Sequence, residues 1–187
     1  MNKEQLLKHL QPDRLRIYFA LSKEKEPDLF TKAIQKFQGT SYSHSLVIYY
    51  SLDFRDYVVA NSHGNAAQLD TLDQFYEVDE VEHLYCKRVS PSERMVTIRK
   101  IIELDGIDYS ESQIFELGIG SIFGQVDKDN DLDGVICSEY ADRIAMASGL
   151  ESTSTIVNKG LDHITPKDNK YAWDKLANER PGFIKLF

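Results

Sequence analysis

Cysteine is scarce in this sequence of 187 residues: Cys86 and Cys137 are its two thiols. Domains held by disulfides carry cysteine at a far higher density, so we expect no disulfide framework and a reducing compartment. No apolar run approaches the length of a membrane-spanning helix. The segment Met1–Leu7 also lacks the apolar core of a secretory signal peptide. We therefore expect a cytoplasmic protein without a membrane span, although release by lysis or injection is compatible with these features.

Basic residues are outnumbered, since 22 lysines and arginines stand against 30 aspartates and glutamates, for a formal net charge of −8. They do not cluster, so we expect neither a nucleic-acid partner nor attraction to anionic membranes. Hydrophobic residues make up 42% of the sequence, as in ordinary globular proteins. The length suits one domain, residues 1–187, and no repeat or linker divides it. The sequence does not indicate an oligomeric state.

Hydrophobic periodicity and turn residues predict a mixture of strands and helices. Strands are expected at residues 15–21, 44–50, 57–62, 81–89 and 183–187. Helices are expected at residues 2–11, 27–38, 71–76, 90–102, from 110, at 138–148 and around Trp173. The charged run Ser22–Glu26 is expected to form a solvated turn. The predicted fold class is α+β, with an antiparallel sheet of about five strands packed against the helix that carries Cys137.

The segment Asp133–Ala145 is the most informative part of the sequence. Two apolar β-branched residues lead into Cys137, and from Ser138 the pattern becomes helical. Cys137 is thus expected at the beginning of a helix, where free backbone N–H groups and the helix dipole favour a thiolate nucleophile. The alternative is that Cys137 packs beneath the helix as a small hydrophobic residue. Cys86 is expected to lie within a strand and to be inert.

A thiolate nucleophile needs a base, and the base needs a third group that orients it. His44 lies at the start of a predicted strand, where a lone histidine is usually a core or rim residue. Asn61 and His63 lie at the far end of the next predicted strand. An antiparallel hairpin would bring that end alongside His44. His44 is therefore the candidate base, with His63 as the third residue or Asn61 in its place.

The candidate pair lies within two short motifs, SHSLVI at Ser43–Ile48 and ICSEY at Ile136–Tyr140. They resemble the histidine strand and the cysteine helix of the permuted NlpC-type papain-like hydrolases. This group includes YiiX-like proteins and, more distantly, lecithin:retinol acyltransferase. In the permuted group the histidine strand precedes the cysteine helix, as it does here. Gly106–Tyr109 and Ile164–Asp168 resemble two further stretches of the group, before and after the cysteine segment.

The resemblance implies a thiol-dependent hydrolase that cleaves an amide (peptide or isopeptide) or ester bond through an acyl-enzyme on Cys137, with His44 as general base. It implies no cofactor. The Cys137 backbone N–H would belong to the oxyanion hole. Relatives carry the third polar residue on the strand after the histidine. A gapless alignment puts Ala60 there, which leaves His63 and Asn61 as the candidates.

Peptides, peptidoglycan stem peptides and acyl conjugates are substrates among the relatives, and the sequence does not distinguish between them. One alternative is an acyltransferase that uses the same site. Another is an inactive papain-like scaffold that serves as a binding or structural protein. The departure from the family pattern at the third position keeps this second alternative open.

The acidic stretch Asp129–Gly134 reproduces the opening of an EF-hand calcium loop, D-x-D-x-D-G. Its twelfth position is Tyr140, where a bidentate glutamate is required. Asp129, Asp131 and Asp133 are therefore weak Ca²⁺ candidates, and no metal site is expected. We favour a solvated acidic turn, whose carboxylates would raise the pKa of a nearby thiol.

Overall fold

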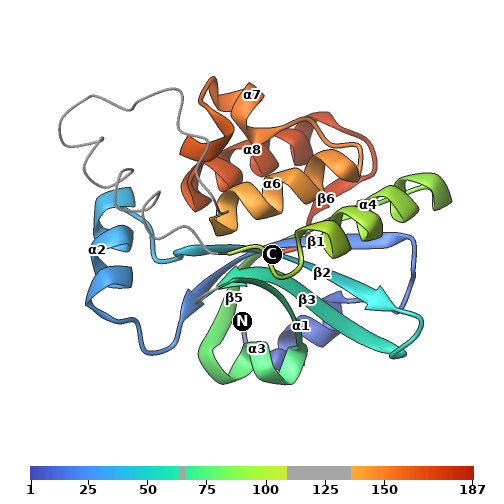
Figure 1. Ribbon diagram of the computed structural model, residues 1–187, viewed down its shortest axis with the longest axis horizontal. Helices are drawn as coiled ribbons and strands as arrows, with labels where there is room; N and C mark the ends of the chain where they lie inside the picture. Colours follow the sequence, from blue (N-terminus) through green and yellow to red (C-terminus); the bar gives the residue numbers. More distant parts are fainter. Residues whose placement is uncertain (64–65, 109–135) are drawn as a thin grey trace.

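The computed structural model describes residues 1–63, 66–108 and 136–187. Six strands in this described part form one sheet in the order β4-β3-β2-β1-β5-β6 (Figure 1). All neighbouring strands are antiparallel. The strands are β1 Arg16–Glu24, β2 His44–Ser51, β3 Asp56–His63, β4 Ala66–Thr71, β5 Asp79–Arg88 and β6 Phe183–Lys185.

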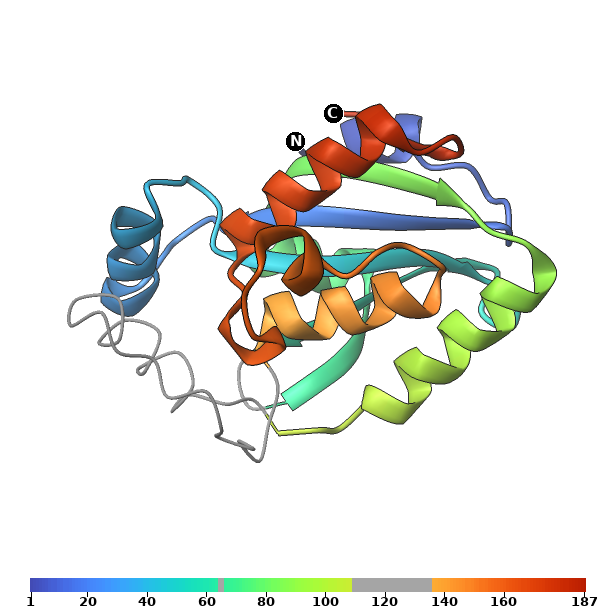
Figure 2. The ribbon, with the colours of Figure 1, turned by 90° about the horizontal axis from the view of Figure 1, so that it is seen from above.

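Helices cover both faces of this sheet, as Figures 1 and 2 show. α4, α6 and α8 lie on one face, whereas α1 and α3 lie on the other. The helices are α1 Lys3–His9, α2 Leu29–Gln38, α3 Leu72–Val78, α4 Pro91–Leu104, α6 Cys137–Ala147, α7 Thr153–Val157 and α8 Pro166–Glu179, with a 3₁₀ turn at Leu161–His163. The predicted α+β class is therefore confirmed.

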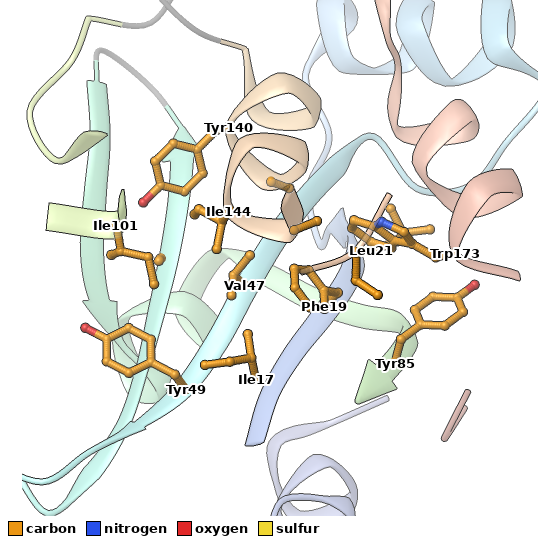
Figure 3. Close-up of a cluster of buried hydrophobic side chains, with 14 of the residues drawn as sticks. Ile17, Phe19, Leu21, Val47, Tyr49, Tyr85, Ile101, Tyr140, Ile144 and Trp173 are labelled. Carbon is orange, nitrogen blue, oxygen red and sulfur yellow. The ribbon is translucent and has the colours of Figure 1, made fainter. Parts of the chain in front are cut away.

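The two faces of the central strands bury separate hydrophobic clusters. The cluster beneath α4, α6 and α8 (Figure 3) contains Ile17, Phe19, Leu21, Val47, Tyr49, Tyr85, Ile101, Tyr140, Ile144 and Trp173. The cluster against α1 and α3 contains Leu6, Tyr18, Ala20, Leu46, Ile48, Val59 and Phe75. Consecutive strand residues point to opposite faces, so the apolar runs in β1 and β2 are buried on both sides. The position of a residue in this alternation therefore decides which helices its side chain faces.

Several helix ends agree with the local sequence signals. α3 and α4 begin with the predicted capping boxes, formed by Thr71 with Gln74 and by Ser90 with Glu93. Gly39 ends α2 with φ 65°, a conformation that glycine adopts without strain. These ends depend on residues within four positions of one another, which explains why the sequence predicts them.

Two expectations were wrong. The described sheet has six strands instead of about five, because residues 66–71 form β4 beside β3. The run Ser22–Glu26 is not a solvated turn, since β1 continues to Glu24 and Ser22 is 0% exposed. Both edges of β1 are paired here, and Ser22 lies opposite His44 of β2. Pairing with distant strands overrides the local preference of this charged run.

No helix in residues 1–63, 66–108 or 136–187 combines the length and the hydropathy needed to cross a bilayer. The helix expected from Ser110 lies outside the described residues.

Candidate active site

Helix α6 begins at Cys137, as predicted. Its N-cap is Ile136, whose side chain accepts no hydrogen bond, so the first-turn N–H groups have no side-chain cap. The Cys137 sulfur lies 3.9 Å from the carbonyl oxygen of Ser43. The backbone N–H groups of Ser45 and Ser138 also lie close enough to favour a thiolate. The helix therefore places its first residue against the start of β2.

The Cys137 thiol is nevertheless protonated at neutral pH. Burial is the largest influence and raises its pKa to about 11, and the charge of Asp79 acts in the same direction. The surrounding backbone N–H groups lower the pKa, but by less. The side chain is 4% exposed, so the thiolate loses more hydration than the helix terminus compensates. The expected N–H groups are in place, but desolvation has the larger effect on the pKa of Cys137. A reaction at this sulfur therefore needs a neighbouring base.

His44 is the first residue of β2 and is 6% exposed. Its Cα pairs with that of Ser22 across the β1–β2 ladder. The next residue, Ser45, points to the other face, where its hydroxyl accepts a hydrogen bond from α8. By alternation the His44 ring leaves the strand on the side of Leu46, which faces α1 and α3. The Cys137 sulfur contacts the carbonyl oxygen of Ser43, the residue before His44, so both candidate residues lie near the start of β2.

The two candidates for the third residue lie on β3. The β2–β3 ladder ends at the pair Val47 and Ala60, so His63 lies three residues beyond the last paired residue of β3. The side chain of His63 is outside the described part of the structure, so its role stays a prediction. Asn61 is 3% exposed, and its Nδ2 donates to Oδ2 of Asp70 on β4 at 2.7 Å. This bond directs the amide nitrogen of Asn61 toward β4, away from β2.

A buried polar network that the sequence analysis missed holds the start of α6. Asn169 on α8 is 0% exposed, and its Nδ2 donates to the carbonyl oxygen of Ser138 at 3.0 Å and to Oγ of Ser45 at 3.2 Å. The Ser138 hydroxyl donates to the carbonyl oxygen of Ile164 at 2.7 Å. These bonds join the residue after Cys137 to β2 and to the segment before α8.

The motif Ile164–Asp168 has a local structural role as the start of α8. Thr165 and Asp168 form a capping box, with proline in the first turn. Asn169 follows directly, and it shares a helix face with the buried residues Ala172, Trp173 and Leu176. A polar residue on such an apolar stripe is the signal that identifies Asn169 in the sequence.

The second cysteine lies within β5, as predicted. Cys86 is 2% exposed and belongs to the cluster that faces α1 and α3. Burial raises the pKa of its thiol, and Nη1 of Arg16 donates to its sulfur at 3.9 Å. No helix begins at this position, so Cys86 lacks the backbone N–H groups that surround Cys137.

The weak calcium candidates Asp129, Asp131 and Asp133 lie outside the described residues. Within the described ranges, no group of three or more His, Cys, Asp or Glu side chains is arranged to hold a metal ion.

Comparison with known proteins gives a match at the level of fold. No protein-family model and no curated protein matches the sequence. The structure is similar to that of the metalloprotein YiiX from Escherichia coli O157:H7, with a TM-score of 0.50 and 15% identity, over 95% of this chain and 89% of that chain. The permuted papain-like assignment and the hydrolase activity stay predictions. The predicted YiiX-like fold is confirmed, and this chain is an α+β protein that shares it.

Proposed function

We propose that this chain is a permuted papain-like cysteine hydrolase. It cleaves an amide or ester bond through an acyl-enzyme on Cys137, with His44 as the general base. The observation that carries the proposal is the contact between the first residue of α6 and the start of β2, where the Cys137 sulfur lies 3.9 Å from the carbonyl oxygen of Ser43. His44 is the next residue along the strand. The YiiX-like fold and the two motifs around these residues support the same pair.

The buried, protonated thiol fits a reaction in which the nucleophile forms as the substrate reacts. In the first step the S–H proton passes to the His44 imidazole while the sulfur bonds to the substrate carbonyl carbon. The C–N or C–O bond then breaks, and the amine or alcohol leaves with that proton. A thioester remains on Cys137. Water, which gives a proton to the same imidazole, attacks the thioester, and the carboxylic acid leaves as the thiol is restored.

The N–H groups around the sulfur suit the charge that develops on the carbonyl oxygen. The Cys137 N–H at the start of α6 is the predicted oxyanion donor. The Ser45 N–H comes from the strand side and influences the Cys137 sulfur, so it is our candidate for the second donor. Both belong to backbone that is held by the Asn169 network, which keeps them in position before the substrate arrives.

An inactive papain-like scaffold is the second candidate function. The observation in its favour is the thiol itself, which is 4% exposed and whose pKa burial raises to about 11. A sulfur in this state is a poor nucleophile at neutral pH unless a base acts on it. If the protein is such a scaffold, the contact between α6 and β2 contributes only to the packing of the fold.

The two candidates are separated with p-nitrophenyl acetate, an activated ester that needs little specific recognition. The wild-type protein is expected to release p-nitrophenol in a burst, to carry one acetyl group on Cys137 in peptide mass spectra, and then to turn over. Cys137→Ala removes the burst. His44→Ala slows acetylation by about 100-fold or more, because the general base is lost. Cys86→Ala is the matched control, since it removes the other buried thiol, and it keeps the burst.

Two outcomes would overturn the proposal. A wild-type protein whose Cys137 gains no acetyl group is the inactive scaffold. Equal acetylation rates in the wild type and in His44→Ala would remove the role of the histidine. Addition of a primary amine then distinguishes an acyltransferase, which passes the acetyl group to the amine, from a hydrolase, which passes it to water.

A further inference from the structure

The residue opposite the candidate base is a buried serine. Ser22 is 0% exposed, and its Cα pairs with that of His44 in the β1–β2 ladder. Directly opposed residues on neighbouring strands have side chains on the same face. The Ser22 hydroxyl and the His44 ring therefore leave the sheet side by side, on the face that carries α1 and α3.

The Ser22 hydroxyl leads to a buried carboxylate. Its Oγ donates to Oδ2 of Asp79, the first residue of β5, at 3.2 Å. Asp79 is 3% exposed, and its backbone N–H donates to the carbonyl oxygen of Phe75 at the end of α3. The residue is thus held through both its backbone and its side chain. A carboxylate accepts several hydrogen bonds, and burial of an ionised one is costly unless donors or cations surround it.

The charge of the same carboxylate acts on the candidate nucleophile. After burial and the N–H groups of Ser45 and Ser138, the charge of Asp79 is the next influence on the Cys137 thiol, and it raises the pKa. Ser22 joins Asp79 to the position opposite His44, and the charge of Asp79 acts on the Cys137 thiol.

We propose that Asp79, anchored by Ser22, is the positioning residue for His44. This inference rests on the proposed function. The carboxylate accepts a hydrogen bond from the imidazole nitrogen that does not exchange the substrate proton. It thereby fixes the tautomer and the ring orientation. When the thiol proton reaches His44, the imidazolium is stabilised by the Asp79 charge, and Asp79 itself takes up no proton.

The other titratable groups around this carboxylate have contacts of their own. Glu24 lies opposite Asp79 in the β1–β5 ladder, and its Oε1 accepts a hydrogen bond from Oγ1 of Thr31 at 2.9 Å. The Lys25 ammonium donates to the carbonyl oxygen of Tyr76. The N-terminal ammonium of Met1 donates to a carbonyl oxygen of β5 at 2.6 Å. None of these contacts involves the Asp79 side chain, so a difference between the wild type and an Asp79 variant is assigned to the Asp79 carboxylate.

The test follows the histidine titration by ¹H–¹⁵N NMR, with the His44 signal assigned by its loss in His44→Ala. Asp79→Asn is expected to lower the pH midpoint of the His44 titration by about one unit, because an adjacent negative charge favours the imidazolium. It is also expected to slow acetylation of Cys137 by p-nitrophenyl acetate about tenfold or more. Asp142→Asn is the matched control. Asp142 is another fully buried carboxylate with a serine donor, Oγ of Ser152 at 2.6 Å.

A second variant leaves Asp79 intact and covers the case in which Asp79→Asn does not fold. In His44→Ala the ¹³C titration of the Asp79 carboxyl is expected to move to higher pH, since the neighbouring imidazolium is gone. Unchanged titrations of both residues would overturn the pairing even if Cys137 is acetylated normally. Shifted titrations without acetylation would overturn the hydrolase and leave the Asp79–His44 pair standing.

Discussion

The Nδ2 atom of Asn169 lies 3.0 Å from the carbonyl oxygen of Ser138, so a fully buried side chain of α8 is bonded to the residue that follows the candidate nucleophile. The same nitrogen reaches Oγ of Ser45 on β2. One amide group thus joins α8, α6 and β2 at the point where Cys137 meets the strand. Because a buried carbonyl that loses its donor costs free energy, this contact couples the stability of the fold to the geometry of the site.

Asn169→Ala is expected to lower the free energy of unfolding by about 1–3 kcal/mol and to slow acetylation of Cys137. Urea denaturation and p-nitrophenyl acetate measure the two effects. The control is Asn178→Ala on the same helix, where Nδ2 donates to the backbone of Asp174 at an exposed position, with an expected change within about 0.5 kcal/mol. If the two variants are equally stable, the network does not hold the start of α6.

Substitution of tyrosine by phenylalanine is expected to change the free energy of unfolding in opposite directions at two buried positions. The Tyr140 hydroxyl is buried and has no hydrogen-bond partner within the described ranges. The Tyr85 hydroxyl donates to Oδ1 of Asp174 at 2.8 Å. An unpaired buried hydroxyl is unfavourable, whereas a paired one stabilises the fold. Tyr140→Phe should therefore raise the free energy of unfolding by about 1 kcal/mol, and Tyr85→Phe should lower it by a similar amount. Loss of stability in Tyr140→Phe would contradict the assignment.

The buried thiol of Cys137 predicts a pH dependence of stability. Burial raises its pKa from the ordinary 9.0 to about 11 in the folded state, so folding favours the neutral thiol. The contribution of the neutral thiol to the free energy of unfolding is fully present below the pKa that Cys137 has in the unfolded state. It is lost as the pH rises through the pKa that Cys137 has in the folded state. Between pH 8 and pH 11 the stability of the wild type relative to Cys137→Ala should fall by about 2 kcal/mol.

The comparison with Cys137→Ala is needed because tyrosines act in the same direction at high pH. Burial also raises the pKa of Tyr42, to about 12. Both proteins keep their tyrosines, so the difference between their free energies of unfolding measures the contribution of Cys137 ionisation. A difference that stays constant from pH 8 to pH 11 would show that Cys137 is accessible to water in the folded state.

Local sequence was sufficient for the elements that position the candidate nucleophile. The helix that starts at Cys137, the strand that starts near His44 and the capping boxes of α3 and α4 all follow from residues a few positions apart. The same reasoning failed for Ser22, where a charged run predicted a turn. That residue belongs to β1 because strands from two distant parts of the chain pair with it.

The properties on which the chemistry depends are not local. The helix terminus at Cys137 favours a thiolate, and the residues that show this are adjacent in sequence. α6 packs against β2, α4, β3 and α8, elements from distant parts of the chain. No short motif encodes the burial of its first residue, which reverses the balance. Asn169 and Asp79 likewise reach the site from elements that the motifs around Cys137 and His44 do not include. Motifs thus predict which residues react, whereas desolvation and long-range hydrogen bonds determine the protonation state and orientation in which they are held.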